Sequence, residues 1–178
     1  VDDVSQRPPA APAGIEKYLV GTNATPFSPT GGLRISARDM GKVMLMLMNG
    51  GRHEGAQILE PASLDTMFAR QWAHDGNNGD TDKGLFNVWG LGNQHFPDQA
   101  GMRLVEGGGF AGVGHLGEAY GLMSVFAADL AGRDGMIMLV GGVSSDPEAY
   151  KGKYSAMPRF EEQVLGALHR RVIIGDKV

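Results

Sequence analysis

The chain has 178 residues, of which 42% are hydrophobic and 20% charged, and its formal net charge is -4. This composition is typical of one soluble globular domain or a large part of one, and the lack of a basic face argues against a nucleic-acid partner. The sequence contains no cysteine, which excludes disulfides, thiolate zinc sites and a cysteine nucleophile. No apolar run approaches the roughly 18 residues of a membrane span, so no membrane-spanning segment is expected.

Residues 1–27 are expected to form an extended arm or linker. Residues 7–14 are rich in proline and alanine, which favour an extended chain over a helix or a strand. The first residues, Val1–Arg7, include neither an initiator methionine nor a signal-peptide pattern. We therefore expect the chain to be cut from a longer protein, and its residues alone leave the localisation open.

Residues 28–73 are predicted to form a helical segment. Ser36 and Asp39 match a capping box, in which the Ser36 hydroxyl accepts from the backbone N–H of Asp39 and the Asp39 carboxylate from that of Ser36. Apolar residues then recur at helical spacing, namely Met40, Val43, Met44 and Leu47. Since the residues between them are also largely apolar, we expect this helix to be buried on most sides and to end at Gly50–Gly51.

A second helix and a polar loop are expected to follow. Pro61 is expected to open the helix, which ends near residues 71–72 and forms a helical hairpin with the first. Residues 74–86 are predicted to be a loop, and their spaced acids raise the alternative of a calcium site. Counted from Asp75, however, the twelfth position is Phe86 rather than Glu, so a solvated loop is the favoured interpretation.

Residues 87–178 are predicted to form an antiparallel sheet with a C-terminal helix. The sheet is expected to start at residues 88–92, with residues 102–105 as a neighbouring strand. The apolar runs 122–128 and 136–140 are separated by a glycine-containing turn, which predicts an antiparallel hairpin. Because residues 136–140 are all apolar, we expect the second of these strands to be covered on both faces.

Pro158 is expected to open the last helix, which covers one face of the sheet. Its apolar side consists of Phe160, Val164, Leu165 and Leu168. Helices first, then strands, then a closing helix indicate an α+β fold with an antiparallel sheet. The arm, the helical segment, the loop and the sheet are all predicted to be parts of one incomplete domain.

The glycine-rich residues 112–121 are the strongest candidate for a functional site. They hold a single imidazole, His115, and an apolar run follows, which predicts a strand with a polar group at a sheet edge. The flanking glycines leave room for a ligand or another backbone. The alternative is that His115 is an exposed histidine in a glycine-rich loop. Residues 107–112 match G-x-G-x-x-G, but β-like runs follow them instead of a helix, which argues against a dinucleotide site.

The histidines show no metal-binding spacing. They are His53, His74, His95, His115 and His169, and none forms an H-x-x-x-H or H-x-H pair. A metal-dependent hydrolase is therefore not favoured, and no metal or cofactor is expected.

Several motifs occur in a recognisable order. Residues 29–40 read P-T-G-G-L-R-I-S-A-R-D-M, and residues 49–61 contain N-G-G followed by G-x-x-I-L-x-P. Residues 89–92 read W-G-L-G, and residues 114–117 read G-H-L-G, with Y-G-L-M-S at 120–124. Over roughly residues 27–170 this order resembles the serine β-lactamase-like hydrolases, a group that includes class C β-lactamases, D-alanyl-D-alanine carboxypeptidases, D-aminopeptidases and related esterases. The G-H-L-G stretch is similar to their third catalytic motif, K-T-G or H-x-G.

The resemblance implies an acyl-enzyme mechanism and a set of site residues. It implies that His115 interacts with the substrate or polarises the proton relay, that Gly117 leaves room for an extended substrate, and that the backbone N–H of Glu118 completes the oxyanion hole. The substrate-binding residues that it implies are Gly114, Leu116 and Tyr120. Leu116 replaces the small hydroxyl residue of K-T-G, which removes a hydrogen bond to a substrate carboxylate and argues against true β-lactamase activity.

The other two motifs of that group do not occur in the chain. No serine has a lysine three residues later, as the nucleophile motif S-x-x-K requires, and no tyrosine has Asn or Ser two residues later. The resemblance therefore implies a C-terminal fragment or subunit of a serine hydrolase acting on ester, amide or D-amino-acid peptide bonds, inactive alone.

That interpretation also implies partners. The complete enzyme would take a small-molecule or peptide substrate, and an N-terminal partner segment or a second copy of the chain would complete the fold. A periplasmic or extracellular location would follow the family. The alternative is a non-catalytic binding or scaffold module that keeps the fold.

Overall fold

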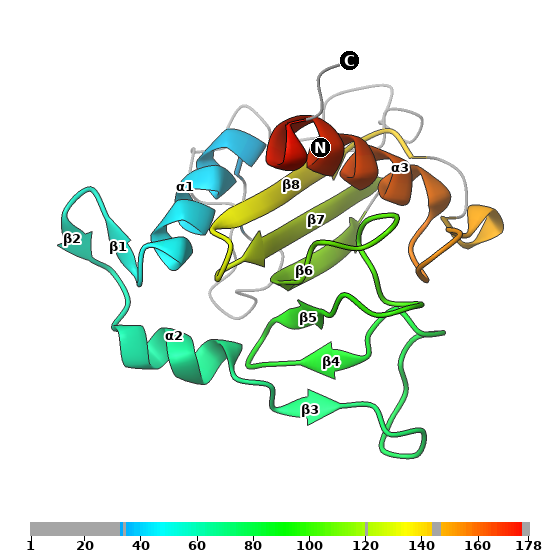
Figure 1. Ribbon diagram of the computed structural model, residues 1–178, viewed down its shortest axis with the longest axis horizontal. Helices are drawn as coiled ribbons and strands as arrows, with labels where there is room; N and C mark the ends of the chain where they lie inside the picture. The colour runs from blue at the N-terminus through cyan, green and yellow to red at the C-terminus, as the bar shows by residue number, and fades with distance from the viewer. Residues whose placement is uncertain (1–32, 34, 120, 144–146, 176–178) are drawn as a thin grey trace, which may run out of the picture.

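The computed structural model describes Leu33 and residues 35–119, 121–143 and 147–175. These residues form an α+β structure whose centre is a six-stranded antiparallel sheet of order β3-β4-β5-β6-β7-β8, followed by a C-terminal helix, α3 (Figure 1). The predicted α+β class with an antiparallel sheet and a C-terminal helix is confirmed. The arm expected over residues 1–27 lies outside the described residues.

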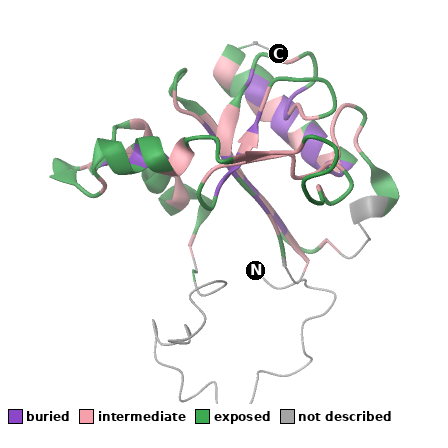
Figure 2. Cartoon of the chain, turned by 90° about the horizontal axis from the view of Figure 1, so that it is seen from below, coloured by how far each residue is buried: buried purple, intermediate pink, exposed green. Residues whose placement is uncertain are grey.

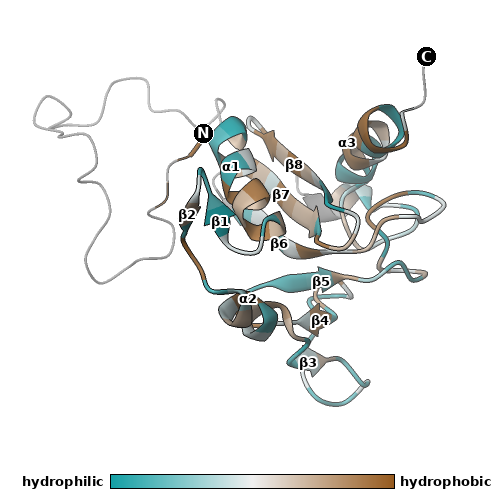
Figure 3. Ribbon diagram, turned by 60° about the vertical axis from the view of Figure 1, so that its left-hand side comes forward, coloured by the Kyte–Doolittle hydropathy of each residue, from teal (hydrophilic) through white to brown (hydrophobic). Residues whose placement is uncertain are grey.

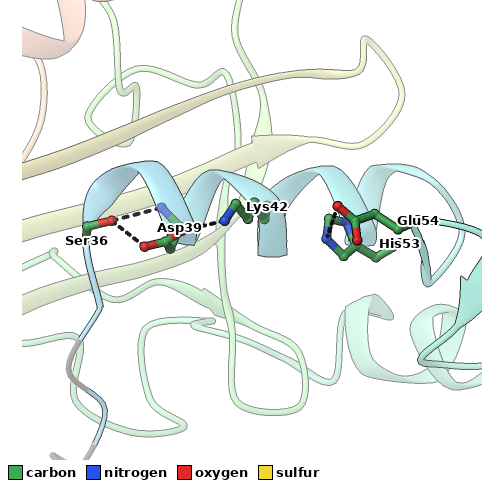
Figure 4. Close-up of polar contacts among 5 residues, drawn as sticks. All are labelled: Ser36, Asp39, Lys42, His53 and Glu54. Atoms are coloured by element: carbon green, nitrogen blue, oxygen red, sulfur yellow. Dashed lines mark hydrogen bonds and ion pairs between the residues drawn. The ribbon is translucent and has the colours of Figure 1, made fainter.

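Helix α1 (Ala37–Met48) begins at the predicted capping residue, Ser36. The Ser36 hydroxyl accepts a hydrogen bond of 3.0 Å from the backbone N–H of Asp39 and donates one of 2.8 Å to the Asp39 carboxylate (Figure 4). Lys42 donates to the other oxygen of that carboxylate at 2.7 Å. The carboxylate thus receives the Ser36 hydroxyl rather than the Ser36 backbone N–H that a full capping box would use.

Most of the surface of α1 is exposed or half-buried, so the expectation that this helix is buried on most sides is wrong. Met44 is its buried residue, whereas Val43 and Leu45 are 36% and 56% exposed. The reason is that α1 packs over β8 with one face, where Met44 lies against Gly135. A Cβ at position 135 would overlap the Met44 sulfur, so this glycine sets how closely the helix approaches the sheet.

A short hairpin that the sequence did not predict separates the helices. It consists of β1 (Arg52–His53) and β2 (Ala56–Gln57), so a strand pair replaces the short connection of the expected helical hairpin. Helix α2 (Pro61–Phe68) begins at the predicted proline. It ends before residues 71–72, because β3 (Trp72–Ala73) forms the edge of the large sheet.

The remaining strands follow in chain order. They are β4 (Val88–Trp89), β5 (Gln94–Phe96), β6 (Gly112–Ala119), β7 (Leu122–Asp129) and β8 (Asp134–Val140). The predicted hairpin of residues 122–128 and 136–140 is confirmed by the pairing of β7 with β8. Residues 102–105 do not form a strand, since Met102 makes an isolated bridge to Ser155 and the next residues along the chain enter the core. Strand β5 pairs with β4 in their place.

The core lies between the sheet and α3 (Arg159–Leu168), which continues into a π-helical turn, η4 (His169–Ile174). Leu116, Val125 and Met138 face this helix from three neighbouring strands and pack in one cluster with Leu165. Figure 2 shows the buried residues concentrated in this layer. The predicted last helix, opening after Pro158 and covering one face of the sheet, is therefore confirmed.

Among the described residues, the other face of the sheet is covered only in part. Figure 3 shows α1 and α3 on opposite sides of β7 and β8. Side chains alternate along a strand, so the residues next to the core residues point toward the α1 side. At the end of β8 remote from Gly135, Leu139 is 40% exposed. The expectation that residues 136–140 are covered on both faces is therefore wrong for this end of the strand.

Candidate functional site

Strand β6, which contains the predicted site residues, has one open edge. It pairs with β7 from Val113 to Ala119, whereas β5 pairs with residues 112–114. Within the part of the chain that the structure describes, the outer edge of β6 beyond Gly114 has no strand partner. Such an edge leaves backbone N–H and C=O groups to bind an extended ligand.

A cavity of about 670 Å³ lies beside this part of β6. Its walls come from the loop of residues 82–86, from the end of the β6–β7 hairpin, and from residues 151–158 with the first turn of α3. Leu116, Gly117 and Glu118 line it. The volume falls within the usual range of small-molecule sites, about 300 to 1,000 Å³. Three of the predicted site residues are thus brought together at one cavity.

His115 is not among the residues that line the cavity. Its side chain is exposed on the opposite face of β6, edge-on to the Trp89 ring with 5.3 Å between ring centroids. Its Nδ1 contacts the backbone carbonyl of Leu116. The residue lies in a strand, so its interpretation as a loop histidine is wrong, while its catalytic role stays a prediction. Tyr120 lies outside the described residues.

Two glycines of β6, Gly114 and Gly117, lie close to different groups of the neighbouring strand β7. Gly114 is buried, and a Cβ there would overlap the backbone carbonyl of Phe126 in β7. Gly117 pairs with Ser124, whose hydroxyl lies 3.4 Å from the Gly117 carbonyl oxygen. A Cβ at Gly117 would meet only that hydroxyl, which can rotate away. The first glycine therefore serves the packing of the sheet, and the second leaves the cavity open.

Glu161, in the first turn of α3, is the cavity residue that the sequence analysis missed. It is 2% exposed, lines the cavity, and its Oε1 has no hydrogen-bond partner among the described residues. Burial raises the pKa of Glu161 to about 7, and the negative charge of Glu118 acts in the same direction. At neutral pH a substantial fraction of Glu161 therefore carries a proton, which makes it able to donate or accept one.

The neighbouring Glu162 is buried with full hydrogen bonding. Its carboxylate accepts from the backbone N–H groups of Lys153, Tyr154 and Ser155 at 2.7, 3.1 and 2.9 Å, and from the Ser155 hydroxyl at 2.8 Å. Buried carboxylates with several backbone donors hold loops in place. Glu162 thereby fixes the loop that forms one wall of the cavity.

Tyr154 belongs to the same wall. Its hydroxyl donates a hydrogen bond of 3.1 Å to the backbone carbonyl of Glu162. Burial, and next the charge of Glu162, raise the pKa of Tyr154 to about 12. The phenol therefore stays protonated at neutral pH and acts as a donor that holds the wall.

Other functional chemistry finds less support in the described residues. They contain no group of three or more His, Asp or Glu side chains placed to hold a metal ion. In the loop considered for calcium, Asp75 accepts from the backbone N–H groups of Asn77 and Asn78 at 2.8 and 3.0 Å, as in an ordinary turn. Among the described helices, none has the length and apolar character that crossing a membrane requires.

Comparisons of the chain with protein-family models, with curated proteins and with solved structures found no match. The function is therefore inferred from an open strand edge that borders a cavity with a buried carboxylate.

Proposed function

We propose that the chain is the C-terminal part of a serine hydrolase of the β-lactamase-like group, acting on ester, amide or D-amino-acid peptide bonds. The observation that carries the proposal is that the G-H-L-G stretch, residues 114–117, lies in a strand whose outer edge is open and borders a cavity. An extended substrate can pair with such an edge as an added strand. Gly117 and Glu118 lie on the open part, where such a substrate would pass.

The proposed mechanism needs a serine from an S-x-x-K segment, located elsewhere in the protein or on a partner chain. Its oxygen forms a bond to the substrate carbonyl, the leaving group departs with the serine proton, and water then hydrolyses the acyl-enzyme. The backbone N–H of Glu118 and that of the serine would donate to the oxyanion, which is worth about 3 to 4 kcal/mol per donor. His115, exposed on the α1 side of β6, would contact the substrate or the proton relay.

The first test separates the chain from the complete enzyme. The isolated chain should not hydrolyse nitrocefin or p-nitrophenyl esters, because it has no activated nucleophile. The longer product of the same gene, or the chain co-expressed with its gene neighbours, should react with a fluorophosphonate probe at one serine of an S-x-x-K motif. Absence of labelling in every such preparation would reject the proposal and leave a non-catalytic binding module.

A second test addresses His115 in the labelled enzyme. His115→Ala should lower turnover by about 10²-fold, the usual scale for a positioned acid–base or electrostatic group. His53→Ala is the matched control, because His53 lies in the β1–β2 hairpin beside Glu54 and not on β6, the strand with the open edge (Figure 4). Equal turnover of both variants, or a loss in His115→Ala that accompanies a lowered melting temperature, would remove His115 from the mechanism.

A further inference from the structure

We propose that the cavity beside β6 binds a small organic cation, with its ammonium or amidinium group at Glu161 and Glu118 and its apolar body against the other walls. The inference goes beyond the proposed hydrolase activity and holds whether or not the chain takes part in hydrolysis. It rests on an unmet acceptor, on the charges around it, and on the shape and lining of the cavity.

The unmet acceptor is Oε1 of Glu161. The residue is 2% exposed and lines the cavity, and this oxygen has no partner among the described residues. Buried carboxylates are normally paired or fully hydrogen-bonded, as the adjacent Glu162 is. A ligand with N–H donors would supply the missing bond from inside the cavity.

The charged group that acts most on Glu161 is another carboxylate, that of Glu118. Glu118 on β6 disfavours ionisation of Glu161 and adds to the effect of burial. The other titratable groups that line the cavity are Asp82, Lys83, Lys151, Lys153 and the phenol of Tyr154. The side chains of the three lysines are exposed. A ligand cation between Glu118 and Glu161 would be attracted by both carboxylates and would relieve their repulsion.

The remaining lining suits an organic body. Apolar side chains line the cavity from all three walls, namely Leu85, Phe86, Leu116, Met123 and Pro158. A volume of about 670 Å³ exceeds what an ammonium group needs. A bare divalent cation fits less well, because Ca²⁺ takes about six to eight oxygen ligands and the described residues include no group of three or more acidic or histidine side chains placed to hold a metal ion. An amine with an aromatic or aliphatic body matches both the acids and the apolar surface.

The experiment measures binding to the isolated chain with three probes of one shape. 2-Phenylethylammonium carries the charge, 2-phenylethanol is its neutral counterpart, and 3-phenylpropanoate is an anionic one. Titration calorimetry and backbone amide NMR shifts at pH 7.5 should show that the ammonium probe binds at least about tenfold more tightly than either of the others. The shifts should fall on β6, on residues 82–86 and on the start of α3.

Variants then identify the acids. Glu161→Gln should weaken the ammonium probe by about tenfold or more, and Glu118→Gln should weaken it several-fold. Glu60→Gln, at the start of α2, is the matched control and should leave the affinity unchanged, since Glu60 is exposed and does not line the cavity. Because the cation favours ionised Glu161, binding at pH 6.5 should release protons, measured in buffers of different ionisation enthalpy, and Glu161→Gln should abolish that release.

Several results would overturn the inference. They are equal binding of 2-phenylethanol and the ammonium probe, unchanged affinity in both Glu161→Gln and Glu118→Gln, or shifts confined to other surfaces. Glu118 is exposed, so Glu118→Gln keeps the test valid even if the buried substitution alters folding. Success here with no labelled serine would support a binding module, whereas a labelled serine with no amine binding would leave only the hydrolase proposal.

Discussion

Two consecutive glutamates show that burial alone does not define the role of a side chain. Glu161 and Glu162 are 2% and 3% exposed. Glu162 accepts from several donors of its own loop, whereas Glu161 lines a cavity and its Oε1 has no hydrogen-bond partner among the described residues. The Glu162 carboxylate is therefore a structural group, and the Glu161 carboxylate is available to a ligand or a proton.

The pH dependence of stability should reveal Glu161. Its folded-state pKa of about 7 lies above its ordinary value of 4.5, so the folded state binds the proton more tightly than the unfolded state. The free energy of unfolding should therefore fall as the pH rises from about 4.5 to 7, by roughly 3 kcal/mol from this group, and stay lower above that range. Urea unfolding of wild type and Glu161→Gln at pH 5 and pH 8 measures it.

The variant should lose most of that decrease, because glutamine has no proton to release. Glu60→Gln, at the exposed residue that precedes α2, should keep the wild-type slope. Parallel pH profiles for wild type and Glu161→Gln would mean that Glu161 titrates near its ordinary pKa.

At the scale of single residues, the residues of β6 that line the cavity were predicted from the sequence, whereas Glu161 on α3 was not. Leu116, Gly117 and Glu118 were implied by the resemblance of the G-H-L-G stretch to a catalytic motif. Glu161 was not among the predicted site residues. The signal was its position, three, four and seven residues before Val164, Leu165 and Leu168, which places it on the apolar stripe.

Among the elements, β6 contains two glycines whose surroundings in β7 differ. Gly114 lies under the backbone carbonyl of Phe126, and Gly117 lies beside the hydroxyl of Ser124. A backbone group of a strand paired on both sides cannot move, whereas a serine hydroxyl can adopt another rotamer.

Alanine substitutions should separate these cases. Gly114→Ala should lower the free energy of unfolding by about 3 kcal/mol, because β6 and β7 must shift apart. Gly117→Ala should cost no more than about 1 kcal/mol, because Ser124 can turn away. Urea unfolding at one pH measures both variants, and equal losses would contradict the close contact at Gly114.

Long, regular elements were predictable from the sequence, and most of the short strands were not. The start of α1 at Ser36, the start of α3 after Pro158 and the β7–β8 hairpin follow from capping residues, proline and apolar runs. Strand β4 lies within the predicted residues 88–92, whereas β3 and β5, with two and three residues, are too short for a recognisable alternation and were not predicted. Their place in the sheet is set by tertiary contacts, and residues 102–105 enter the core as a loop for the same reason.

At the scale of the whole molecule, the described residues leave one face of the sheet covered and the other partly open. α3 covers the closed face, while α1 covers the other near Gly135 and leaves Leu139 40% exposed. Exposed apolar surface on a sheet favours association with another chain or a further segment. We therefore expect the isolated chain to form a dimer or to bind a hydrophobic dye.

Neighbouring residues of β8 test this difference between the faces. Met138→Ser should lower the free energy of unfolding by about 3 kcal/mol, because Met138 is 4% exposed in the core. Leu139→Ser should cost no more than about 1 kcal/mol and should reduce dye binding or dimerisation. Denaturation and light scattering at micromolar concentration measure these effects. A monomeric wild type without dye binding would show that the open face does not promote association.

The order of strands in the sheet also bears on how the chain folds. Within the described six-stranded sheet, each strand pairs with the next one along the chain, so successive hairpins can form without one strand passing through another. The β6–β7 and β7–β8 turns are short, whereas pairing β5 with β6 requires closing the longer loop of residues 97–111. Loop-closure entropy therefore favours β6–β8 as the first part to form, and pulse-labelled amides of β7 should gain protection before those of β5. The cavity, which needs residues 82–86 against β6, would then take shape late, so slow refolding would delay ligand binding more than formation of the core.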